Sequence, residues 1–369
     1  MTKCYNMNIA IVCGARPNFM KVAPIIRAIR NNKSYETINS RLIYTGKQDD
    51  PTLEDSLFND LEIDCPDFYL DVDCENLNEL TGQVMSKFER YLQKYPTDVV
   101  IVVDDLASTM AIAIVTKKQG IKLAHIAAGT RSFDIAMPKE INRLVIDGLS
   151  DILFTAGISN NNIANKEGAE LSKVYMVGNI LIDNLRYYHN RLQRPKLLDR
   201  VGLKEKGYLV FTLNRKALIG NKPHLSLLIK AMINGMKGTA MPILAPLRSE
   251  ATMMVKEILA EIGSPSFFIL IEPQSYLDFA YITANAYGLI TDSGNVAEEA
   301  TFNQVPCITV NSYTEHIETV KQGTNVLVGE DPELLSSSVS DMMSGQWKKA
   351  TLPERWDGRS AERILQILC

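Results

Sequence analysis

Two cations follow the first predicted buried strand of this chain, where their side chains could bind an anion. The apolar run at 9–12 leads into a glycine turn at Gly14, and Arg16 and Lys21 follow as a helical pattern begins. Backbone N–H groups and cations at such a turn favour an anionic ligand, first of all a phosphorylated small molecule. The spacing fits neither G-x-G-x-x-G nor G-x-x-x-x-G-K-[ST], so neither a dinucleotide nor a Walker-type ATP site is predicted. An ordinary strand-to-helix turn is the alternative.

Carboxylates and a histidine follow the next predicted strands. Asp104 and Asp105 lie at the end of the strand predicted at 99–104, just before a helix. A carboxylate at this place can cap the helix or act as a general acid or base, and capping is the commoner role. His125 and Arg131 lie at and just after the end of the strand predicted at 122–126.

A helix predicted to begin at Pro138 carries three charged residues on one face. Glu140, Arg143 and Asp147 are separated by three and four positions, which places their side chains together. They form either a local ladder of ion pairs or, through Arg143, part of a cluster of cations around a diphosphate. That cluster would also contain Arg16, Lys21 and Arg131.

The second half of the chain contains a strand, a tight polar turn and a helix at 290–300. The amides of Ser293 and Gly294 at the helix start can bind phosphate oxygens, and the carboxylate of Glu299 can accept from the diol of a ribose. This combination predicts a nucleoside diphosphate sugar as the ligand.

Composition excludes several other classes of protein. The formal net charge of -4, with charges spread evenly along the chain, gives no basic face for nucleic acid. No run approaches the ~18 apolar residues of a membrane span, and no signal-peptide core follows the first residues, so we expect a cytoplasmic protein without membrane contact. The six cysteines, Cys4 among them, form no C-x-x-C pair and are expected to be reduced, and the four scattered histidines give no metal-binding spacing.

Short apolar runs alternate with helical patterns, which predicts an α/β fold with parallel strands covered by helices on both faces. A chain of 369 residues suits two domains. We predict an N-terminal domain at 1–190, a linker at 194–200, a second domain at 200–350 and a C-terminal helix at 351–369 that packs back near the domain junction. The strands are predicted at 8–13, 41–45, 99–104, 122–126, 152–155 and 174–177, then at 208–212, 242–245, 267–271, 288–291, 306–310 and 326–328. Two doubly wound domains of this kind would place their strand ends along a shared cleft.

Taken together, these segments resemble the UDP-N-acetylglucosamine 2-epimerase family over nearly the whole chain and in the same order. The matching motifs are G-x-R-P-x-x-x-K at 14–21, P-x-D-V-V at 96–100, H-x-x-A-G-x-R at 125–131, E-I-N-R at 140–143, G-N-x-x-I-D at 178–183, P-Q-x-Y-L-x-F at 273–279, T-D-S-G-x-x-x-E-E-A at 291–300 and T-E-H-x-E at 314–318.

The resemblance implies two Rossmann-like domains facing a central cleft, in a glycosyltransferase-B-like arrangement. It implies an isomerase that eliminates UDP across C1 and C2 of UDP-N-acetylglucosamine and adds it back after protonation of the other face, giving UDP-N-acetylmannosamine. No cofactor is needed, the N-terminal domain serves the sugar and the second domain the UDP, and a homodimer working in cell-surface polysaccharide biosynthesis is expected. The residues it assigns to catalysis are Asp105, Glu140 and His125, and those it assigns to substrate binding are Arg16, Lys21, Arg131, Arg143, Asn214, Arg215, Gln274, Ser293, Gly294, Glu299 and His316.

The chain departs from the family pattern at three positions that matter for proton transfer. Ala127 replaces the glutamate of H-x-E-A-G, Lys139 replaces the first glutamate of P-E-E-x-N-R, and Asn214 replaces the histidine of G-H-R-R-E. Each group that acts in proton transfer contributes about 10²-fold or more to the rate. Three hypotheses follow: an isomerase with its proton transfer redistributed, a hydrolase or transferase acting on a UDP-sugar, or a catalytically silent UDP-sugar binder.

Overall fold

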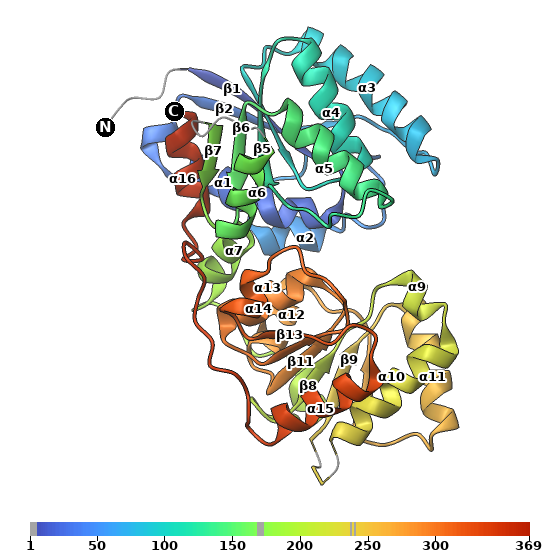
Figure 1. Ribbon diagram of the computed structural model, residues 1–369. Coiled ribbons are helices and arrows are strands. Elements are labelled where there is room, and N and C mark those ends of the chain that lie inside the picture. Colours follow the sequence, from blue (N-terminus) through green and yellow to red (C-terminus); the bar gives the residue numbers. More distant parts are fainter. Residues whose placement is uncertain (1–5, 168–172, 237, 240) are drawn as a thin grey trace. The chain divides into compact units, whose positions relative to one another are not determined.

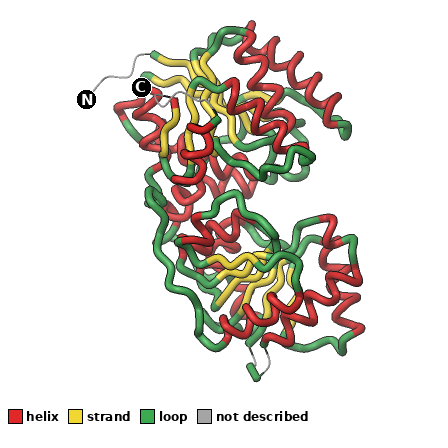
Figure 2. The backbone as a smooth tube through the Cα atoms, in the orientation of Figure 1, coloured by secondary structure: helices red, strands yellow, loops and turns green. Residues whose placement is uncertain are grey.

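The computed structural model describes residues 6–167, 173–236, 238–239 and 241–369. The chain divides into two compact units, one of Met1–Tyr187 with Glu354–Cys369 and one of Tyr188–Pro353. Each unit has a parallel sheet covered by helices (Figure 1), and the tube in Figure 2 shows the regular alternation of strand and helix. The α/β fold with two doubly wound domains, predicted from the alternation of apolar runs, is confirmed.

The first unit is built on a seven-stranded sheet with the order β3-β2-β1-β4-β5-β6-β7. All its strand pairs are parallel. Every residue of β4 is buried, as expected for a central strand covered on both faces. The strands are β1 (Met7–Cys13), β2 (Ile38–Tyr44), β3 (Phe68–Tyr69), β4 (Val99–Val103), β5 (Lys122–Ala128), β6 (Ile152–Thr155) and β7 (Val174–Met176).

Helices cover both faces of this sheet. On one face α3, α4 and α5 lie side by side, and on the other α1 packs against α16, which comes from the end of the chain (Figure 1). The helices are α1 (Arg16–Asn31), α2 (Asp55–Leu61), α3 (Leu77–Lys94), α4 (Ala107–Lys118), α5 (Pro138–Leu149), α6 (Ile158–Lys166), α7 (Leu181–Tyr188, whose last residue belongs to the second unit) and α16 (Ser360–Leu368), with a 3₁₀ turn η1 (Lys33–Tyr35).

The C-terminal segment is fixed to the first unit by specific contacts. The indole of the buried Trp356 donates to the carbonyl of Ala156 at 3.0 Å, and Asp183 of α7 accepts from the amides of Ser360 and Ala361 at 3.0 and 2.8 Å. Burial raises the pKa of Asp183 to about 6, against the effect of these amide bonds. Asp183 therefore caps α16 from a distant part of the sequence.

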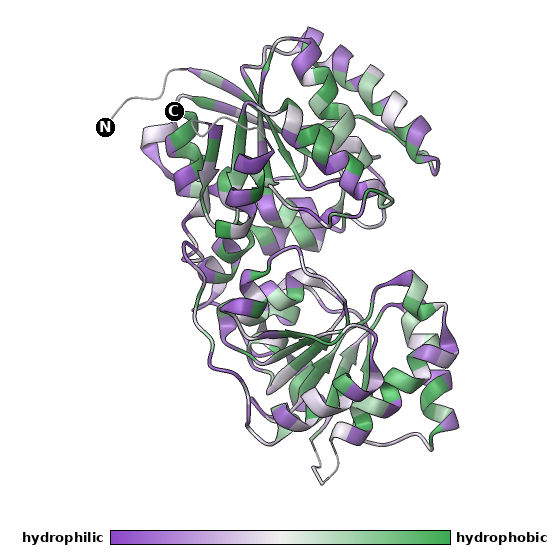
Figure 3. Cartoon of the chain, viewed as in Figure 1, coloured by the Kyte–Doolittle hydropathy of each residue, from purple (hydrophilic) through white to green (hydrophobic). Residues whose placement is uncertain are grey.

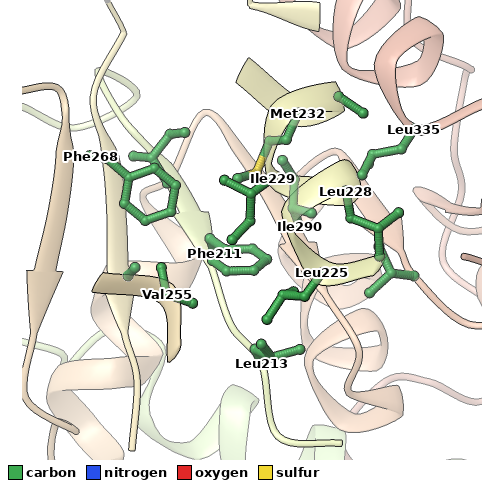
Figure 4. Close-up of a cluster of buried hydrophobic side chains, with 14 of the residues drawn as sticks. Phe211, Leu213, Leu225, Leu228, Ile229, Met232, Val255, Phe268, Ile290 and Leu335 are labelled. Carbon is green, nitrogen blue, oxygen red and sulfur yellow. The ribbon is translucent and has the colours of Figure 1, made fainter. Parts of the chain in front are cut away.

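The second unit has a six-stranded parallel sheet with the order β10-β9-β8-β11-β12-β13. Figure 4 shows part of its core, where Phe211, Ile229 and Ile290 are packed together. The strands, coloured as hydrophobic over much of their length in Figure 3, are β8 (Leu209–Phe211), β9 (Ile243–Pro246), β10 (Phe268–Ile271), β11 (Gly288–Thr291), β12 (Cys307–Thr309) and β13 (Asn325–Leu327).

The helices of this unit include a close pair, α10 and α15. A Cβ on Gly235 of α10 would lie 2.4 Å from the carbonyl oxygen of Ser336, so only glycine permits this approach. The helices are α8 (Lys196–Arg200), α9 (Lys216–Ile219), α10 (Lys222–Gly235), α11 (Ser249–Glu261), α12 (Tyr276–Ala284), α13 (Gly294–Asn303), α14 (Glu318–Lys321) and α15 (Pro332–Met343).

Strand order reverses once in each sheet, between β1 and β4 and between β8 and β11. In open α/β sheets, ligands bind beyond the carboxyl ends of the strands at such a switch point. The loops that follow β1 and β4 in the first unit, and β8 and β11 in the second, are therefore where a site is expected.

Three details of the sequence analysis are wrong. The stretch 194–200 is more than a linker, because Lys196–Arg200 forms α8 and its Leu198 is fully buried. The two-residue strand β3 was not predicted, since two residues carry no recognisable alternation. Cys13, Cys65, Cys74 and Cys307 are free thiols as expected, but Cys369 is disulfide-bonded, and Cys4 lies outside the described residues.

Among the described residues, none of the helices combines the length and apolar character that crossing a bilayer requires.

Candidate active site

The turn between β1 and α1 is held by the side chain of Asn18. Its Oδ1 accepts from the amides of Gly14 and Ala15 at 2.9 and 3.1 Å, and its Nδ2 donates to Asp104 Oδ2 at 2.8 Å. A Cβ on Gly14 would lie 2.2 Å from Ser108 Oγ, so the glycine lets the turn approach the start of α4. Asn18 thus joins the loops after β1 and β4 at the switch point.

Asp104 forms a partly buried ion pair with Lys21. The Lys21 Nζ lies 2.6 Å from Asp104 Oδ1. Although burial opposes ionisation, Lys21 and the Asn18 amide together hold the pKa of Asp104 below its ordinary value. Asp104 has a left-handed backbone with φ of 60°, and the N-cap position of α4 is Leu106 without a side-chain bond. The prediction that one of the two aspartates caps this helix is therefore wrong.

Asp105 pairs with the arginine of α5. Its Oδ2 accepts from Arg143 Nε at 2.8 Å and lies 2.6 Å from Arg143 Nη2, so one carboxylate oxygen meets two guanidinium nitrogens. On the other side of the carboxylate, Lys139 Nζ lies 3.5 Å from Oδ1. Asn142 also donates to the carbonyl of Asp105 at 2.8 Å. The inward face of α5 therefore holds the loop after β4.

Glu140 binds the loop before its own helix. Its Oε2 accepts from the amide and hydroxyl of Ser132 at 2.8 and 2.9 Å, and its Oε1 accepts from the amide of Phe133 at 3.2 Å. Arg143 Nη1 lies 3.3 Å from Oε2. Burial opposes ionisation, but the Ser132 and Phe133 donors and the Arg143 charge lower the pKa of Glu140. Its carboxylate is ionised and already bonded within the protein.

His125 lies between two acceptors. Its Nδ1 is 2.6 Å from Asp147 Oδ1 and its Nε2 is 3.0 Å from the carbonyl oxygen of Asp104. The pKa of Asp147 is lowered, since His125 and Arg131 outweigh its burial, so this carboxylate accepts. A carbonyl also only accepts, so both ring nitrogens of His125 face acceptor oxygens of the protein. While both bonds are kept, neither nitrogen is free to exchange a proton with a substrate.

Arg131 is bound on the same side as Asp147. Its Nη2 lies 2.8 Å from Asp147 Oδ2, its Nε donates to Glu167 Oε1 at 2.9 Å, and its Nη1 donates to the carbonyl of Thr130 at 2.7 Å. The ladder of ion pairs expected on α5 is thus present only in part, because Glu140 meets Arg143 whereas Asp147 meets Arg131 and His125.

Arg16 differs from the other cations predicted for a diphosphate. Lys21, Arg131 and Arg143 are each paired with carboxylates of the chain. Arg16 is half-buried at the first position of α1, and none of the described residues bonds its guanidinium. In the first unit it is the predicted cation most available to a ligand anion.

In the second unit, Asp292 binds the loop after β8. Its Oδ2 accepts from the amides of Asn214 and Arg215 at 2.8 and 2.6 Å, and its carbonyl accepts from Asn311 Nδ2 at 2.8 Å. The Asn214 side chain is exposed, whereas Arg215 contacts Glu330 and the carbonyl of Val310. The loops after β8, β11 and β12 are thereby joined.

Several buried polar atoms around these loops have no hydrogen-bond partner within the described structure. They are Asp292 Oδ1, Asn311 Oδ1, Arg215 Nε and Glu299 Oε2. A buried polar atom without a partner is costly, so these four atoms are candidates for contact with a ligand.

Glu299 is the most perturbed of this group. It lies inside α13 with 6% of its surface exposed, and burial together with the neighbouring Glu298 raises its pKa to about 8. Glu298 itself lies 3.6 Å from His316 Nε2. Glu299 therefore needs hydrogen-bond donors, which the hydroxyls of a ribose would provide.

The start of α13, where phosphate-binding amides were expected, is open to solvent at Gly294. Gly294 is exposed and has free space where a Cβ would be, while the amide of Ser293 is already bonded to Thr291 Oγ1 at 3.0 Å. Gln274, after β10, donates to the carbonyl of Glu272 at 2.6 Å. Gly294 is thus the better placed of the two predicted amide donors.

The structure brings the predicted residues together as two sets. The first-unit set surrounds the ends of β1, β4 and β5. In the second unit the predicted residues follow β8 and β11, with His316 after β12 near Glu298, whereas Gln274 follows β10 and donates to the carbonyl of Glu272. Sequence reasoning missed Asn18, Asp292 and Asn311 as members, although each follows a predicted strand and could have been found by that position alone. No cluster of three or more metal-ligating side chains occurs in the described part of the chain.

Comparison with known proteins assigns the family. The family model described as UDP-N-acetylglucosamine 2-epimerase matches residues 29–369, and the chain therefore belongs to that family.

The sequences of two named relatives align with this chain over most or nearly all of its length. A UDP-N-acetylglucosamine 2-epimerase of Methanocaldococcus jannaschii is 33% identical, with 98% of this chain and 99% of the relative covered. A UDP-2,3-diacetamido-2,3-dideoxy-D-glucuronate 2-epimerase of Pseudomonas aeruginosa is 31% identical over 90% of this chain and 91% of the relative. The solved structure of the M. jannaschii enzyme in complex with UDP-GlcNAc and UDP superposes with a TM-score of 0.85 at 32% identity, covering 98% of this chain and 99% of that one.

Proposed function

We propose that the protein is an isomerase that interconverts UDP-N-acetylglucosamine and UDP-N-acetylmannosamine, or a closely related pair of UDP-sugars. The observation that carries this proposal is the unpartnered carboxylate of Glu299, buried at the second-unit switch point in a member of this epimerase family. The M. jannaschii relative, whose name states the same reaction, and its complex with UDP-GlcNAc and UDP support the choice of substrate.

The second-unit set is proposed to bind the nucleotide. Glu299 accepts from the ribose hydroxyls, and the amide of Gly294 donates to a phosphate oxygen. Asn214, Arg215, Gln274, Ser293 and His316 remain proposed contacts of the same ligand. No cofactor takes part.

The first-unit set is proposed to serve the sugar. In the first step a base takes the proton from C2, the C–H electron pair forms the C1=C2 bond, and the C1–O bond breaks with its pair on UDP. In the second step a proton is delivered to the other face of C2 and UDP adds back to C1. The Arg16 cation would stabilise the leaving diphosphate.

Asp105 is the proposed base, because its Oδ1 meets only the Lys139 ammonium among the described residues while Oδ2 is held by Arg143. The opposite face needs a second group, for which Glu140 and His125 remain candidates. Each would first have to release bonds that it now makes, Glu140 to Ser132 and His125 to the Asp104 carbonyl. We propose that Lys21, Arg131 and Arg143 position the carboxylates with which they are paired, in addition to any contact with phosphate.

Incubation with UDP-N-acetylglucosamine in deuterated water tests the proposal. Proton NMR should show loss of the C2 proton signal and appearance of UDP-N-acetylmannosamine. Free UDP without exchange at C2 would instead indicate a hydrolase, or a transferase that also hydrolyses its donor. Binding of UDP without any turnover would indicate a silent binder. Either of the last two results contradicts the isomerase.

We also propose that the protein is a homodimer formed through the outer face of α5 and the loop before it. The buried face of α5 is charged, whereas Ile141 and Leu144 on its other face are 41% and 39% exposed, and Phe133 and Ile135 are 76% and 70% exposed. Contiguous exposed apolar residues mark protein contacts. Sedimentation velocity should give a dimer for the wild type and a monomer for Leu144→Asp, and a monomeric wild type contradicts the proposal.

A cytoplasmic location stays a prediction, to be checked by cell fractionation.

A further inference from the structure

Lys139 is a cation beside a carboxylate that is already neutralised. Its Nζ lies 3.5 Å from Asp105 Oδ1, a distance too long for a good hydrogen bond, and its side chain is 58% exposed. Asp105 already receives two charge-assisted bonds from Arg143, at 2.8 and 2.6 Å. The Lys139 ammonium is therefore directed towards the proposed reaction site without being used there by the protein.

A contribution to the stability of the fold does not explain why a lysine occupies position 139. An exposed ion pair contributes about 0–1 kcal/mol. Lys139 is also the second residue of α5, after Pro138, and a cation in the first turn of a helix is disfavoured by the helix dipole. A neutral or acidic residue at this position would stabilise the helix better.

Proton transfer is also a poor explanation. Lysines that act as bases are ones whose ammonium is stripped of water by burial. Lys139 is more than half exposed, so burial does not strip its ammonium of water. A compact, hydrated ammonium on a flexible stem is suited to meeting a mobile anion.

The remaining partner is the substrate. We propose that Lys139 is a specificity-determining residue that binds a carboxylate carried by the sugar, so that the preferred substrate is an acidic UDP-sugar. This inference rests on the proposed function and narrows its substrate class. The ammonium would move from Asp105 to the sugar carboxylate, which also frees Asp105 Oδ1 to approach C2.

This arrangement couples recognition to catalysis at one carboxylate. With a neutral sugar, the Lys139 ammonium stays beside Asp105 Oδ1. With an acidic sugar, the ammonium bonds the sugar carboxylate and leaves Asp105 Oδ1 open to the C2 proton. Both effects favour an acidic substrate over a neutral one of the same size.

The test compares three substrates with the full-length protein. UDP-N-acetylglucosamine is the neutral reference, UDP-N-acetylglucosaminuronate carries a carboxylate at C6, and UDP-N-acetylmuramate carries one on its 3-O-lactyl group. Deuterium exchange at C2 gives kcat/KM for each. We expect one acidic substrate to exceed the neutral one at least tenfold, as for a hydrogen bond between charged groups.

The variants Lys139→Gln and Lys139→Arg separate charge from geometry. Lys139→Gln should lower kcat/KM for the preferred acid at least tenfold more than for UDP-N-acetylglucosamine, chiefly through KM, and Lys139→Arg should retain most of the preference. Lys118→Gln, an exposed lysine at the end of α4, is the matched control and should change neither value. The acid that is preferred locates the carboxylate on the sugar.

Two outcomes overturn the inference alone. Equal kcat/KM for neutral and acidic substrates removes the recognition role, and an equal loss on all substrates in Lys139→Gln assigns the lysine to proton transfer instead. If no substrate binds or exchanges, the proposed function fails together with this inference. If UDP-N-acetylglucosamine is epimerised without preference, the proposed function stands and only the specificity assignment is lost.

Discussion

Replacing Glu299 with glutamine should make the free protein more stable and UDP binding weaker. The pKa of about 8, raised by burial and by Glu298, compares with an ordinary value of 4.5. At about 1.36 kcal/mol per pKa unit, the folded state loses up to about 5 kcal/mol when the group ionises within it. The variant removes this cost and also removes the anion that accepts from the ribose.

The sign follows from proton binding. Between pH 4.5 and about 8 the folded state holds a proton on Glu299 that the unfolded state has released. Stability is therefore full below pH 4.5, falls as pH rises, and levels off above pH 8. The gain in melting temperature of Glu299→Gln over wild type should grow from pH 5 to pH 9 by about 10 °C, taking about 2–4 °C per kcal/mol.

Binding should show the opposite trend. If UDP requires the ionised carboxylate, the wild-type dissociation constant at pH 7 is about tenfold larger than at pH 9, and calorimetry in two buffers should detect a proton released on binding. Glu299→Gln should lose this pH dependence and bind UDP about 10- to 100-fold more weakly at pH 9. Glu250→Gln, an exposed glutamate in the first turn of α11, is the control and should match wild type in both assays.

The reasoning is refuted by either of two results. Equal differences in melting temperature at pH 5 and pH 9 would show that Glu299 is not a buried acid with a raised pKa. If Glu299→Gln bound UDP at pH 9 as tightly as the wild type does, Glu299 would not be the residue that binds the ribose.

Three other substitutions test the first unit. Arg16→Ala should weaken UDP binding about tenfold in calorimetry while the melting temperature stays within about 1 °C, because its guanidinium bonds none of the described residues; a large loss of stability would contradict this. Asp104→Asn should lower the free energy of unfolding by about 3–5 kcal/mol in urea titrations, because it removes the counter-charge of the buried Lys21. Adding Lys21→Met to Asp104→Asn should recover part of this loss. An unchanged free energy of unfolding would mean that water solvates the Lys21 ammonium in the variant. Ala127→Glu should raise the rate of C2 exchange at least tenfold in the NMR assay if a carboxylate is limiting at that position, and an unchanged rate would show that proton transfer uses other groups.

Periodicity and strand ends made most of the fold predictable. The buried runs at 152–155 and 288–291 were predicted at the bounds they have as β6 and β11, because both are short, apolar and flanked by turn residues. Segment 194–200 failed because its α8 has a single buried leucine, too few for a helical stripe. The expectation of a glycosyltransferase-B-like arrangement came from the resemblance to the epimerase family, because hydrophobic periodicity carries no information about how two domains are arranged.

The candidate site was predictable in position and less so in pairing. Strand ends located Lys21, Asp105 and Arg143, but the spacing did not say that each would bind another member of the set. Asp147 was expected beside Arg143 and instead meets His125 and Arg131, because these lie on β5 and the loop after it, beneath the helix. Contacts between residues far apart in sequence depend on how strands and helices stack, and one sequence does not record that.

The two units differ in how their polar groups are satisfied, and this difference bears on the missing catalytic residues. In the first unit the carboxylates of Asp104, Asp105 and Glu140 are each bonded to a cation or an amide of the protein, so these carboxylates are satisfied without ligand. In the second unit Glu299 and Asp292 keep atoms without partners.

A site whose carboxylates are bonded within the protein tolerates substitution better than a site whose buried carboxylates keep atoms without partners. Ala127 is partly buried and Lys139 is exposed, and neither leaves a buried charge unpaired. Loss of Glu299 would by contrast remove the partner that the nucleotide needs. Two of the three departures from the family pattern, Ala127 and Lys139, lie in the first unit. In the proposed nucleotide set Asn214 departs from the pattern, while Ser293, Gly294 and Glu299 keep it. This distribution is the pattern expected if the sugar differs from that of the family more than the nucleotide does.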